Sequence, residues 1–264
     1  MKMISEITKF DYIVSFRKDS SDEKVIAHSF EEDIYLPEIK YLTFKKNDVI
    51  IDVGAHIGCF SLMLNHITMD KLRFFCFEAS KETFDILEKN VKKNDLQAFT
   101  VVHRAMTSKD NTTIKLYHDE KEGNWGHSVV HDFGSTYEEV SSINLDKFLV
   151  NNKIETIKLI KFNCEGAEID IIMNLSSNGL KKIQNMVLLY HFDLEKNYTL
   201  TQIKEKLIKS GFAIDVKPTS DLRGWIIASR DSKIRLRLFN VFLDLKKAHF
   251  ITKKWLKNLL FKVK

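Results

Sequence analysis

Residues 48–64 read DVIIDVGAHIGCFSLML, and this stretch decides the fold class. The run VIIDV is β-branched and apolar except for its acid, which predicts a strand buried on both faces of a parallel sheet. A glycine follows, and IGCFSLMLNHI then has the pattern of a helix. A strand that turns into a helix at a glycine is a common ligand-binding unit of α/β proteins. The glycine spacing G-x-G-x-x-G of dinucleotide-binding turns is not present, and His56 lies in the turn.

Strand and helix patterns alternate along the chain after this stretch. Strands are predicted in LRFFCFEA, AFTVVHRAM, TIKLIKFNC and IQNMVLLYHF, and helices in SKETFDILEKNVKKNDL, EGAEIDIIMNL and TLTQIKEKLIKSGF. This alternation predicts an α/β fold with a doubly wound, mostly parallel sheet. The last two strands, FAIDVKP and RGWIIASR, are close enough to pair as an antiparallel hairpin. We therefore expect a Rossmann-like, seven-stranded sheet with an antiparallel terminal hairpin, the topology of class I methyltransferases.

Three parts of the chain are expected. Residues 1–47 form an N-terminal cap in which YIVSF and KVIAHSF predict short strands. Residues 48–230 form the α/β domain, and residues 231–264 form a basic amphipathic helical tail. Within the domain, TTIKLYH alternates like an edge strand, and residues 118–142 read as a long polar loop. Loops of that length on α/β domains are typical of lids and substrate-binding segments.

The composition is that of an ordinary soluble protein. The chain has 264 residues, of which 44% are hydrophobic, so it can bury a full core. Three cysteines are far apart and form no C-x-x-C pair, which indicates reduced, buried thiols: Cys59, Cys76 and Cys164. No secretory signal or long apolar run is visible, so a cytoplasmic location is the expectation, with peripheral attachment at the inner face of the membrane as the alternative.

The net charge of +5 is unevenly distributed. Residues 231–264 carry a charge of +8, so the rest of the chain carries −3. A mildly acidic body fits poorly with a phosphate backbone, and we expect no nucleic-acid partner. The basic tail predicts a helix or helix pair that docks on the body or on a second subunit. Peripheral membrane contact through residues 232–264 is the alternative, and the sequence leaves the oligomeric state open.

The acids and glycines of the domain are expected to meet at one edge of the sheet, because ligands of open α/β sheets bind at the carboxyl ends of the strands. Glu78 ends the second strand, where it can accept both ribose hydroxyls of a nucleoside. Asp52 ends the first strand, where it could hold an ammonium group but would repel a pyrophosphate. This combination favours S-adenosylmethionine, which has an ammonium group and a ribose but no phosphate.

Three blocks of the sequence resemble the signature of FkbM-type methyltransferases. They are VIIDVGAHIGCFSL, FCFEAS with FDILEKNVKKN behind it, and IKLIKFNCEGAEIDII. The similarity runs from about Tyr35 to Phe192. It implies a class I methyltransferase fold and methyl transfer from S-adenosylmethionine, usually to an oxygen. Because the family's substrates include glycan sugars and secondary metabolites, the expected acceptor is a sugar hydroxyl in a glycan or glycan precursor.

The resemblance also implies roles for individual residues. Cofactor contacts are implied for Asp52, Gly54, Ala55, His56, Gly58, Glu78, Ala79 and Asn163. Substrate contacts are implied for His127, Ser128 and Glu168. Two positions depart from the family pattern, since His56 stands where Asn is usual and Asn163 where Asp is usual. If that Asp serves as a base or metal ligand, activity in this chain must rest on neighbouring groups.

Two residues are candidate catalytic groups, because an alcohol acceptor needs a proton acceptor. His191 ends the fifth strand, and histidine has a suitable pKa. Glu165 lies at a helix N-terminus, where the helix dipole favours the ionised carboxylate. A divalent metal ion held by Glu165, His191 and Asp193 is conceivable, although the missing carboxylate at Asn163 argues against it.

Other classes of protein fit the sequence less well. A dehydrogenase would have the G-x-G-x-x-G turn and an all-parallel sheet. A methyltransferase of DNA bases would carry an N/D-P-P-aromatic loop, but Pro37 and Pro218 are not adjacent. A non-catalytic binding module with the same fold is the alternative that Asn163 raises, and cofactor binding without turnover would identify it.

Overall fold

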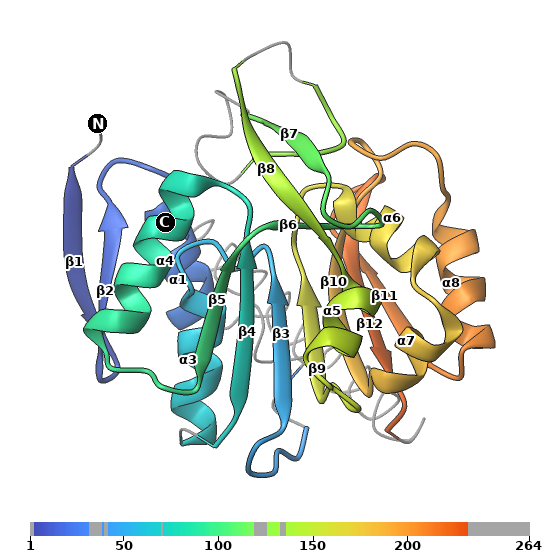
Figure 1. Ribbon diagram of the computed structural model, residues 1–264, viewed down its shortest axis with the longest axis horizontal. Helices are drawn as coiled ribbons and strands as arrows, with labels where there is room; N and C mark the ends of the chain where they lie inside the picture. Colours follow the sequence, from blue (N-terminus) through green and yellow to red (C-terminus); the bar gives the residue numbers. More distant parts are fainter. Residues whose placement is uncertain are drawn as a thin grey trace, which may run out of the picture.

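A seven-stranded sheet lies at the centre of the protein (Figure 1). The computed structural model describes residues 3–31, 39, 42–69, 71–118, 126–132 and 136–231. The strand order across the sheet is β11-β12-β10-β9-β3-β4-β5. The strands are β3 (Val49–Val53), β4 (Arg73–Glu78), β5 (Phe99–His103), β9 (Leu159–Phe162), β10 (Asn185–His191), β11 (Ala213–Pro218) and β12 (Arg223–Ser229).

The pairing directions confirm the fold class that the sequence predicts. β3 pairs in parallel with β4 and β9, β4 pairs in parallel with β5, and β9 pairs in parallel with β10. β12 lies between β10 and β11 and is antiparallel to both. The strand order reverses at β3, because the chain continues to β4 on one side and returns to β9 on the other. Ligands of doubly wound sheets bind at this switch point.

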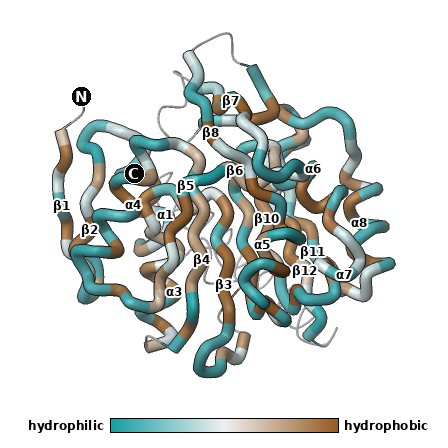
Figure 2. Tube along the Cα trace, viewed as in Figure 1, coloured by the Kyte–Doolittle hydropathy of each residue, from teal (hydrophilic) through white to brown (hydrophobic). Residues whose placement is uncertain are grey.

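The side chains of β3 alternate between two hydrophobic cores. Ile51 and Val53 face the first core, and Ile50 faces the second. The first core includes residues of α5 (Leu145–Asn151), α6 (Ala167–Asn174), α7 (Ser177–Lys182) and α8 (Leu200–Lys209). The second includes residues of α3 (Cys59–Thr68) and α4 (Lys81–Lys93). Figure 2 shows the hydrophobic residues concentrated on the central strands. Helices therefore cover both faces, which explains the apolar run in the sequence.

Two smaller sheets complete the described structure. A hairpin of β1 (Ile4–Lys9) and β2 (Tyr12–Arg17) precedes α1 (Asp22–Phe30). A three-stranded sheet has the order β6-β8-β7, with β6 (Ala105–Thr107), β7 (Thr113–Tyr117) and β8 (Tyr137–Asn144). Figure 1 shows this sheet beyond the carboxyl ends of the central strands. Among the described helices, none has the length and apolar character needed to span a membrane.

Three local predictions from the sequence are wrong. KVIAHSF lies in α1 rather than in a strand, because its apolar residues have helical spacing and Asp22 and Glu23 complement the helix dipole in the first turn. AFTVVHRAM is divided between β5 and β6, since the chain leaves the central sheet at Arg104. The end of the predicted loop 118–142 belongs to β8, which pairs with β7. The predicted tail lies outside the described residues, except for Asp231.

Candidate functional site

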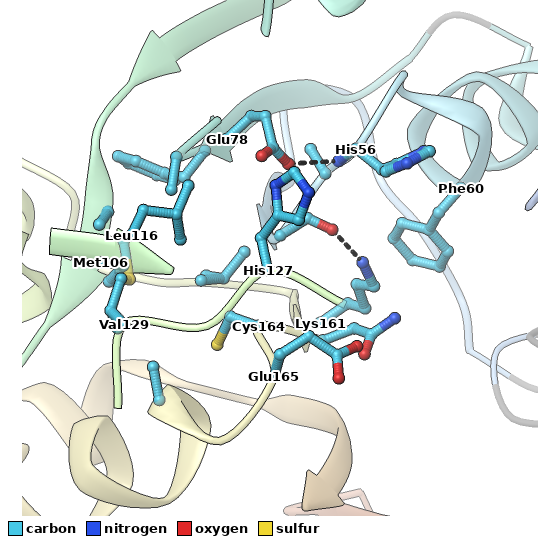
Figure 3. A pocket seen from close by; sticks show the side chains of 18 of the residues that line it. His56, Phe60, Glu78, Met106, Leu116, His127, Val129, Lys161, Cys164 and Glu165 are labelled. Atoms are coloured by element: carbon cyan, nitrogen blue, oxygen red, sulfur yellow. Dashed lines mark hydrogen bonds between the residues drawn. The ribbon is translucent and has the colours of Figure 1, made fainter. Parts of the chain in front are cut away.

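A cavity lies at the carboxyl ends of β3, β4 and β9, at the switch point of the sheet (Figure 3). Its wall contains the turns that follow β3 and β9, the end of β4 and part of α1. In Figure 3 the side chains of Glu78, His127 and Glu165 lie around it. The small sheet and the loop beside it contribute an apolar end, formed by Met106, Leu116 and Val129.

The turn after β3 requires glycine at position 54. Gly54 has a φ of +72°, and a Cβ there would lie 1.9 Å from the carbonyl oxygen of Asn163. The backbone N–H groups of Gly54 and Ala55 both donate to the carbonyl of Phe77, at 3.0 and 2.9 Å. The turn is therefore held between β4 and β9, and its backbone faces the cavity.

Glu78 ends β4 at the cavity wall. One carboxylate oxygen accepts the backbone N–H of His56 at 2.8 Å, and the other accepts that of Ser80 at 2.9 Å. Burial raises the pKa of Glu78, although these hydrogen bonds act in the opposite direction. The carboxylate has further lone pairs on both oxygens, so it can accept hydroxyl groups of a ligand in the cavity.

Asp52 does not line the cavity, in contrast to the role expected for it. Its carboxylate is fully buried and accepts the hydroxyl of Ser61 at 2.8 Å. It also lies 3.0 Å from the ammonium group of Lys161, which donates to the carbonyl of Gly54 at 2.7 Å. Asp52 thus holds an ammonium group, but that group belongs to the protein and supports the glycine turn. Gly58 is the N-cap residue of α3, with a φ of +93°, and likewise does not line the cavity.

The acidic turn after β9 contains a buried ion cluster. Glu168 is fully buried and accepts both the backbone N–H of Gly166 and a ring nitrogen of His191, Nδ1, at 2.8 Å. The other ring nitrogen, Nε2, lies 3.4 Å from Glu165. Burial lowers the pKa of His191, but the carboxylates of Glu168 and Glu165 outweigh it and raise the pKa to about 9.

This cluster places His191 away from the position expected for a catalytic base. The side chain is 1% exposed and does not line the cavity. With a pKa of about 9 the imidazole is protonated at neutral pH, so it has no lone pair that could accept a proton. Glu165 does line the cavity, with its side chain 14% exposed. Of the two candidates, the carboxylate is therefore the group in reach of a ligand.

The remaining predicted residues divide into those at the wall and those behind it. Glu168 and Ser128 lie behind the wall, and Ser128 donates its hydroxyl to the carbonyl of Glu165 at 2.6 Å. The structure places these predicted residues at the cavity: Gly54, Ala55, His56, Glu78, Ala79, His127, Asn163 and Glu165. Sequence reasoning missed the contributions of Arg104 and of α1, which supplies Val25, His28 and Ser29. The helical spacing of KVIAHSF was the one available signal for α1.

The wall fits a phosphate-free nucleoside ligand with a donor group. Its permanent cations among the described residues, Lys161 and Arg104, both have protein acceptors, and Arg104 donates to Asn111 at 2.7 Å. Neither is therefore placed as a dedicated phosphate ligand. The side-chain oxygen of Asn163 is buried and receives no hydrogen bond from the described part of the chain. A ligand ammonium group is a suitable donor to that oxygen, and Glu78 suits a ribose.

The proposed metal triad is not assembled in the described residues. Asp193 is engaged by Arg223, whose Nη2 lies 2.7 Å from one carboxylate oxygen. Burial raises the pKa of Asp193, but the hydrogen bonds and charge of Arg223 outweigh it and lower the pKa overall. Because His191 is occupied by its two glutamates, the set of Glu165, His191 and Asp193 does not converge on one point.

Several solved structures are similar to the chain. They include the methyltransferase FkbM from Methylobacillus flagellatus KT, with 14% identity and a TM-score of 0.48 over 72% of this chain and 45% of that chain. The precorrin-6y C5,15-methyltransferase from Geobacter metallireducens GS-15 has 16% identity and a TM-score of 0.46 over 76% and 89%. TrmK of M. capricolum, in complex with S-adenosylhomocysteine, has 12% identity and a TM-score of 0.46 over 85% and 87%.

The chain thus spans less than half the length of the M. flagellatus protein. No curated protein matches it in sequence. The model of the FkbM methyltransferase domain matches residues 52–214. This range covers more than half of the chain and includes the glycine turn, Glu78 and the acidic turn. The protein therefore belongs to the FkbM methyltransferase family.

Proposed function

We propose that the protein transfers a methyl group from S-adenosylmethionine to a hydroxyl group, and that the acceptor is a sugar in a glycan or glycan precursor. The observation that carries the reaction is the placement of Glu78, Asn163 and Glu165 around one cavity in a chain of the FkbM family. The sugar rests on the known substrates of that family. A hydroxyl of a secondary metabolite has the same chemistry and is the other acceptor class to assay.

Some residues of the cavity would bind the cofactor, and Glu165 would act on the acceptor. S-adenosylmethionine supplies a methyl group on a sulfonium, which reacts by in-line displacement when a nucleophile is correctly positioned. Glu78 would hold the ribose hydroxyls, and Asn163 would accept from the ammonium group. The glycine turn leaves room for the ligand beside the backbone of Ala55 and His56.

Glu165 would accept the proton of the acceptor hydroxyl. It lies at the wall next to Asn163, so the proton acceptor need not be residue 163 itself. Its φ of +48° is unusual for a non-glycine residue, and the hydrogen bond from Ser128 holds its backbone in place. Protonated His191 keeps the carboxylate ionised and oriented, which makes His191 a positioning residue.

Two conservative variants separate cofactor binding from turnover. Glu78→Gln should weaken S-adenosylhomocysteine binding by roughly 10–100-fold, as expected for loss of a charged hydrogen-bond acceptor. Glu165→Gln should bind within a few-fold of the wild type but lose about 100-fold or more in kcat. Calorimetry measures the first effect, and methyl transfer to a panel of sugars and hydroxylated metabolites measures the second. Glu139→Gln, on an exposed position of β8, is the matched control.

The outcomes distinguish a methyltransferase acting on hydroxyl groups from one acting on amines and from a non-catalytic binding module. Binding without turnover on any acceptor would identify a non-catalytic binding module. Unchanged turnover in Glu165→Gln would remove the assigned proton acceptor, and methylation of an amine alone would overturn the hydroxyl assignment. If neither S-adenosylmethionine nor S-adenosylhomocysteine binds, both the enzyme and the binding module are excluded.

A further inference from the structure

A cluster of two imidazoles and one carboxylate lies beside the cavity, apart from the groups assigned to methyl transfer. It consists of His118, His127 and Glu138, all half-buried. One potential ligand atom from each residue lies within 4.8 Å of the other two. His127 also lines the cavity, so the cluster and the cavity share a wall residue (Figure 3). Among the described residues this is the one set of three side chains with such an arrangement.

Backbone pairing places the three side chains on one face of the small sheet. Tyr117 pairs with Ser128 through two hydrogen bonds of 2.8 and 3.0 Å, which sets His118 directly opposite His127. In the register of β7 and β8, Glu138 is opposite Leu116, two residues from His118. Since alternate residues of a strand share a face, Glu138 is the diagonal neighbour of His118 on the same side. The cluster is thus positioned by three paired segments rather than by one flexible loop.

The distances are close to those of a coordinated ion. Nε2 of His118 lies 3.4 Å from Oε1 of Glu138. Two ligands of one tetrahedral zinc ion, with bonds of about 2.0–2.1 Å, are separated by about 3.3 Å. The rings of His118 and His127 stack with their centroids 4.3 Å apart and their planes at 12°. The ligand atoms of all three residues nevertheless lie within 4.8 Å of one another, a spacing from which small side-chain rotations could direct them to a shared ion.

A second contact fixes the carboxylate. The other oxygen of Glu138, Oε2, accepts the backbone N–H of Lys81 at 3.1 Å. Lys81 begins α4, directly after the Glu78 segment of the cavity wall. Outer contacts of this kind orient metal ligands and are a regular part of metal sites. An ion at the cluster would therefore link β7, β8 and the loop residue His127, and through Glu138 it would also link them to the first turn of α4.

We propose that His118, His127 and Glu138 bind one divalent transition-metal ion, and that this ion fixes the His127 wall of the cavity. Two imidazoles and one carboxylate suit zinc and its borderline neighbours, whereas magnesium and calcium prefer oxygen ligands alone. The three protein ligands leave a fourth position for water. This site is different from the triad of Glu165, His191 and Asp193, and it does not depend on the proposed methyl transfer.

Metal titration of the chelator-treated 264-residue protein tests the proposal. Zinc, titrated against a chromogenic chelator, should bind at one ion per chain and raise the melting temperature. Cobalt(II) in the same site should give the intense visible absorption of a four-coordinate ion. Glu138→Gln and His118→Ala should each weaken zinc binding by about 100-fold or more, since even outer contacts contribute about 10–100-fold. His66→Ala, which changes a half-buried histidine in the last turn of α3 that is not part of the cluster, should leave binding unchanged.

Three outcomes would overturn the site. They are the absence of stoichiometric zinc binding, equal affinity in Glu138→Gln and wild type, and a cobalt spectrum typical of six water or surface ligands. Circular dichroism shows whether each variant is folded, and Glu138→Gln preserves the shape of the side chain if His118→Ala does not fold. S-adenosylhomocysteine binding by the zinc-free protein separates failure of this site from failure of the proposed function.

Discussion

At the scale of single residues, Gly54 is needed both for the packing of the turn after β3 and for the shape of the cavity wall. A Cβ at residue 54 would collide with a backbone oxygen at 1.9 Å, and its φ is +72°. Gly54→Ala should therefore lower the free energy of unfolding by about 2–5 kcal/mol, from the left-handed backbone plus the overpacking. Gly211→Ala is the matched control, because it has a φ of +89° but meets only the end of the Arg230 side chain.

Urea unfolding of the two variants measures the difference. The control should lose about 1–2 kcal/mol, which is the cost of the left-handed backbone alone. Equal losses in the two variants would show that the contact with Asn163 is relieved at little cost. Calorimetry with S-adenosylhomocysteine should show weaker binding in Gly54→Ala only, since Gly211 is remote from the cavity.

The raised pKa of His191 predicts that the stability of the protein depends on pH. The pKa of His191 is about 9 in the folded protein and about 6.5 in an unfolded chain. Between these values the folded state holds a proton that the unfolded state has released, so the stability that His191 contributes is fully present below pH 6.5 and is lost as the pH rises toward 9. The expected decline is on the order of 3 kcal/mol.

Unfolding free energies at pH 6.5, 7.5, 8.5 and 9.5 would reveal this decline. His191→Gln should be less stable at neutral pH, because it leaves the carboxylate of Glu168 buried without its cation, but it should lack the decline. Other groups that titrate in this range cancel in the difference between wild type and variant. The same slope in both proteins would show that His191 is neutral in the folded state.

The residues of the site differ in how well sequence reveals their roles. The positions of Gly54 and Glu78 at the cavity could be predicted, because a glycine after a buried strand and an acid at the end of the next strand both fall at the ligand-binding edge of the sheet. The role of Asp52 could not, because Lys161, its partner, is on another strand, and Lys161 and Gly54 are 107 residues apart. The burial of His191 could not be predicted for the same reason, since the two carboxylates that raise its pKa come from a different turn.

At the scale of elements, α1 joins the N-terminal part of the chain to the site. Asp22 in its first turn is fully buried and accepts two hydrogen bonds from the guanidinium of Arg17, at 2.8 and 3.0 Å. Its carboxylate lies 3.4 Å from Nε2 of His56, in the glycine turn. Three residues of α1 line the cavity, so the cap is part of the site. Sequence periodicity placed the elements of the central sheet but assigned this helix to a strand, since seven residues are too few to separate the two patterns.

Asp22→Asn tests whether α1 supports the glycine turn through the contact between Asp22 and His56. It leaves the fully buried guanidinium of Arg17 without its closest anion, which should cost about 3–5 kcal/mol in the free energy of unfolding. It should also weaken S-adenosylhomocysteine binding, because the wall formed by α1 loses its link to His56. Asp19→Asn, an exposed residue of the preceding turn, should change neither quantity. A stable Asp22→Asn variant would show that the ion pair is replaceable, and unchanged affinity would show that α1 contributes no support to the turn.

At the scale of the whole molecule, the strand order could be predicted because the alternation of patterns and the final hairpin restrict an α/β sheet to few topologies. The closing of the cavity by α1 and the small sheet could not, because it depends on contacts between segments far apart in sequence. The charge distribution is a further property of the whole chain: the body carries −3 and residues 231–264 carry +8. This asymmetry is the observation behind the alternative in which residues 232–264 contact an anionic membrane surface.

The alternative of membrane contact through residues 232–264 predicts that the 264-residue protein binds anionic vesicles and not neutral ones, because each basic residue near an anionic membrane contributes about 1 kcal/mol. Changing Lys253, Lys254 and Lys257 to Gln should weaken this binding on the order of 100-fold. Sedimentation with phosphatidylserine-containing vesicles at low and high salt measures it, and salt should reduce the binding of the wild type. The control neutralises three exposed lysines of the body, Lys196, Lys204 and Lys209. Equal loss in this control would assign the effect to net charge, and equal binding to neutral vesicles would exclude an electrostatic contact through residues 232–264.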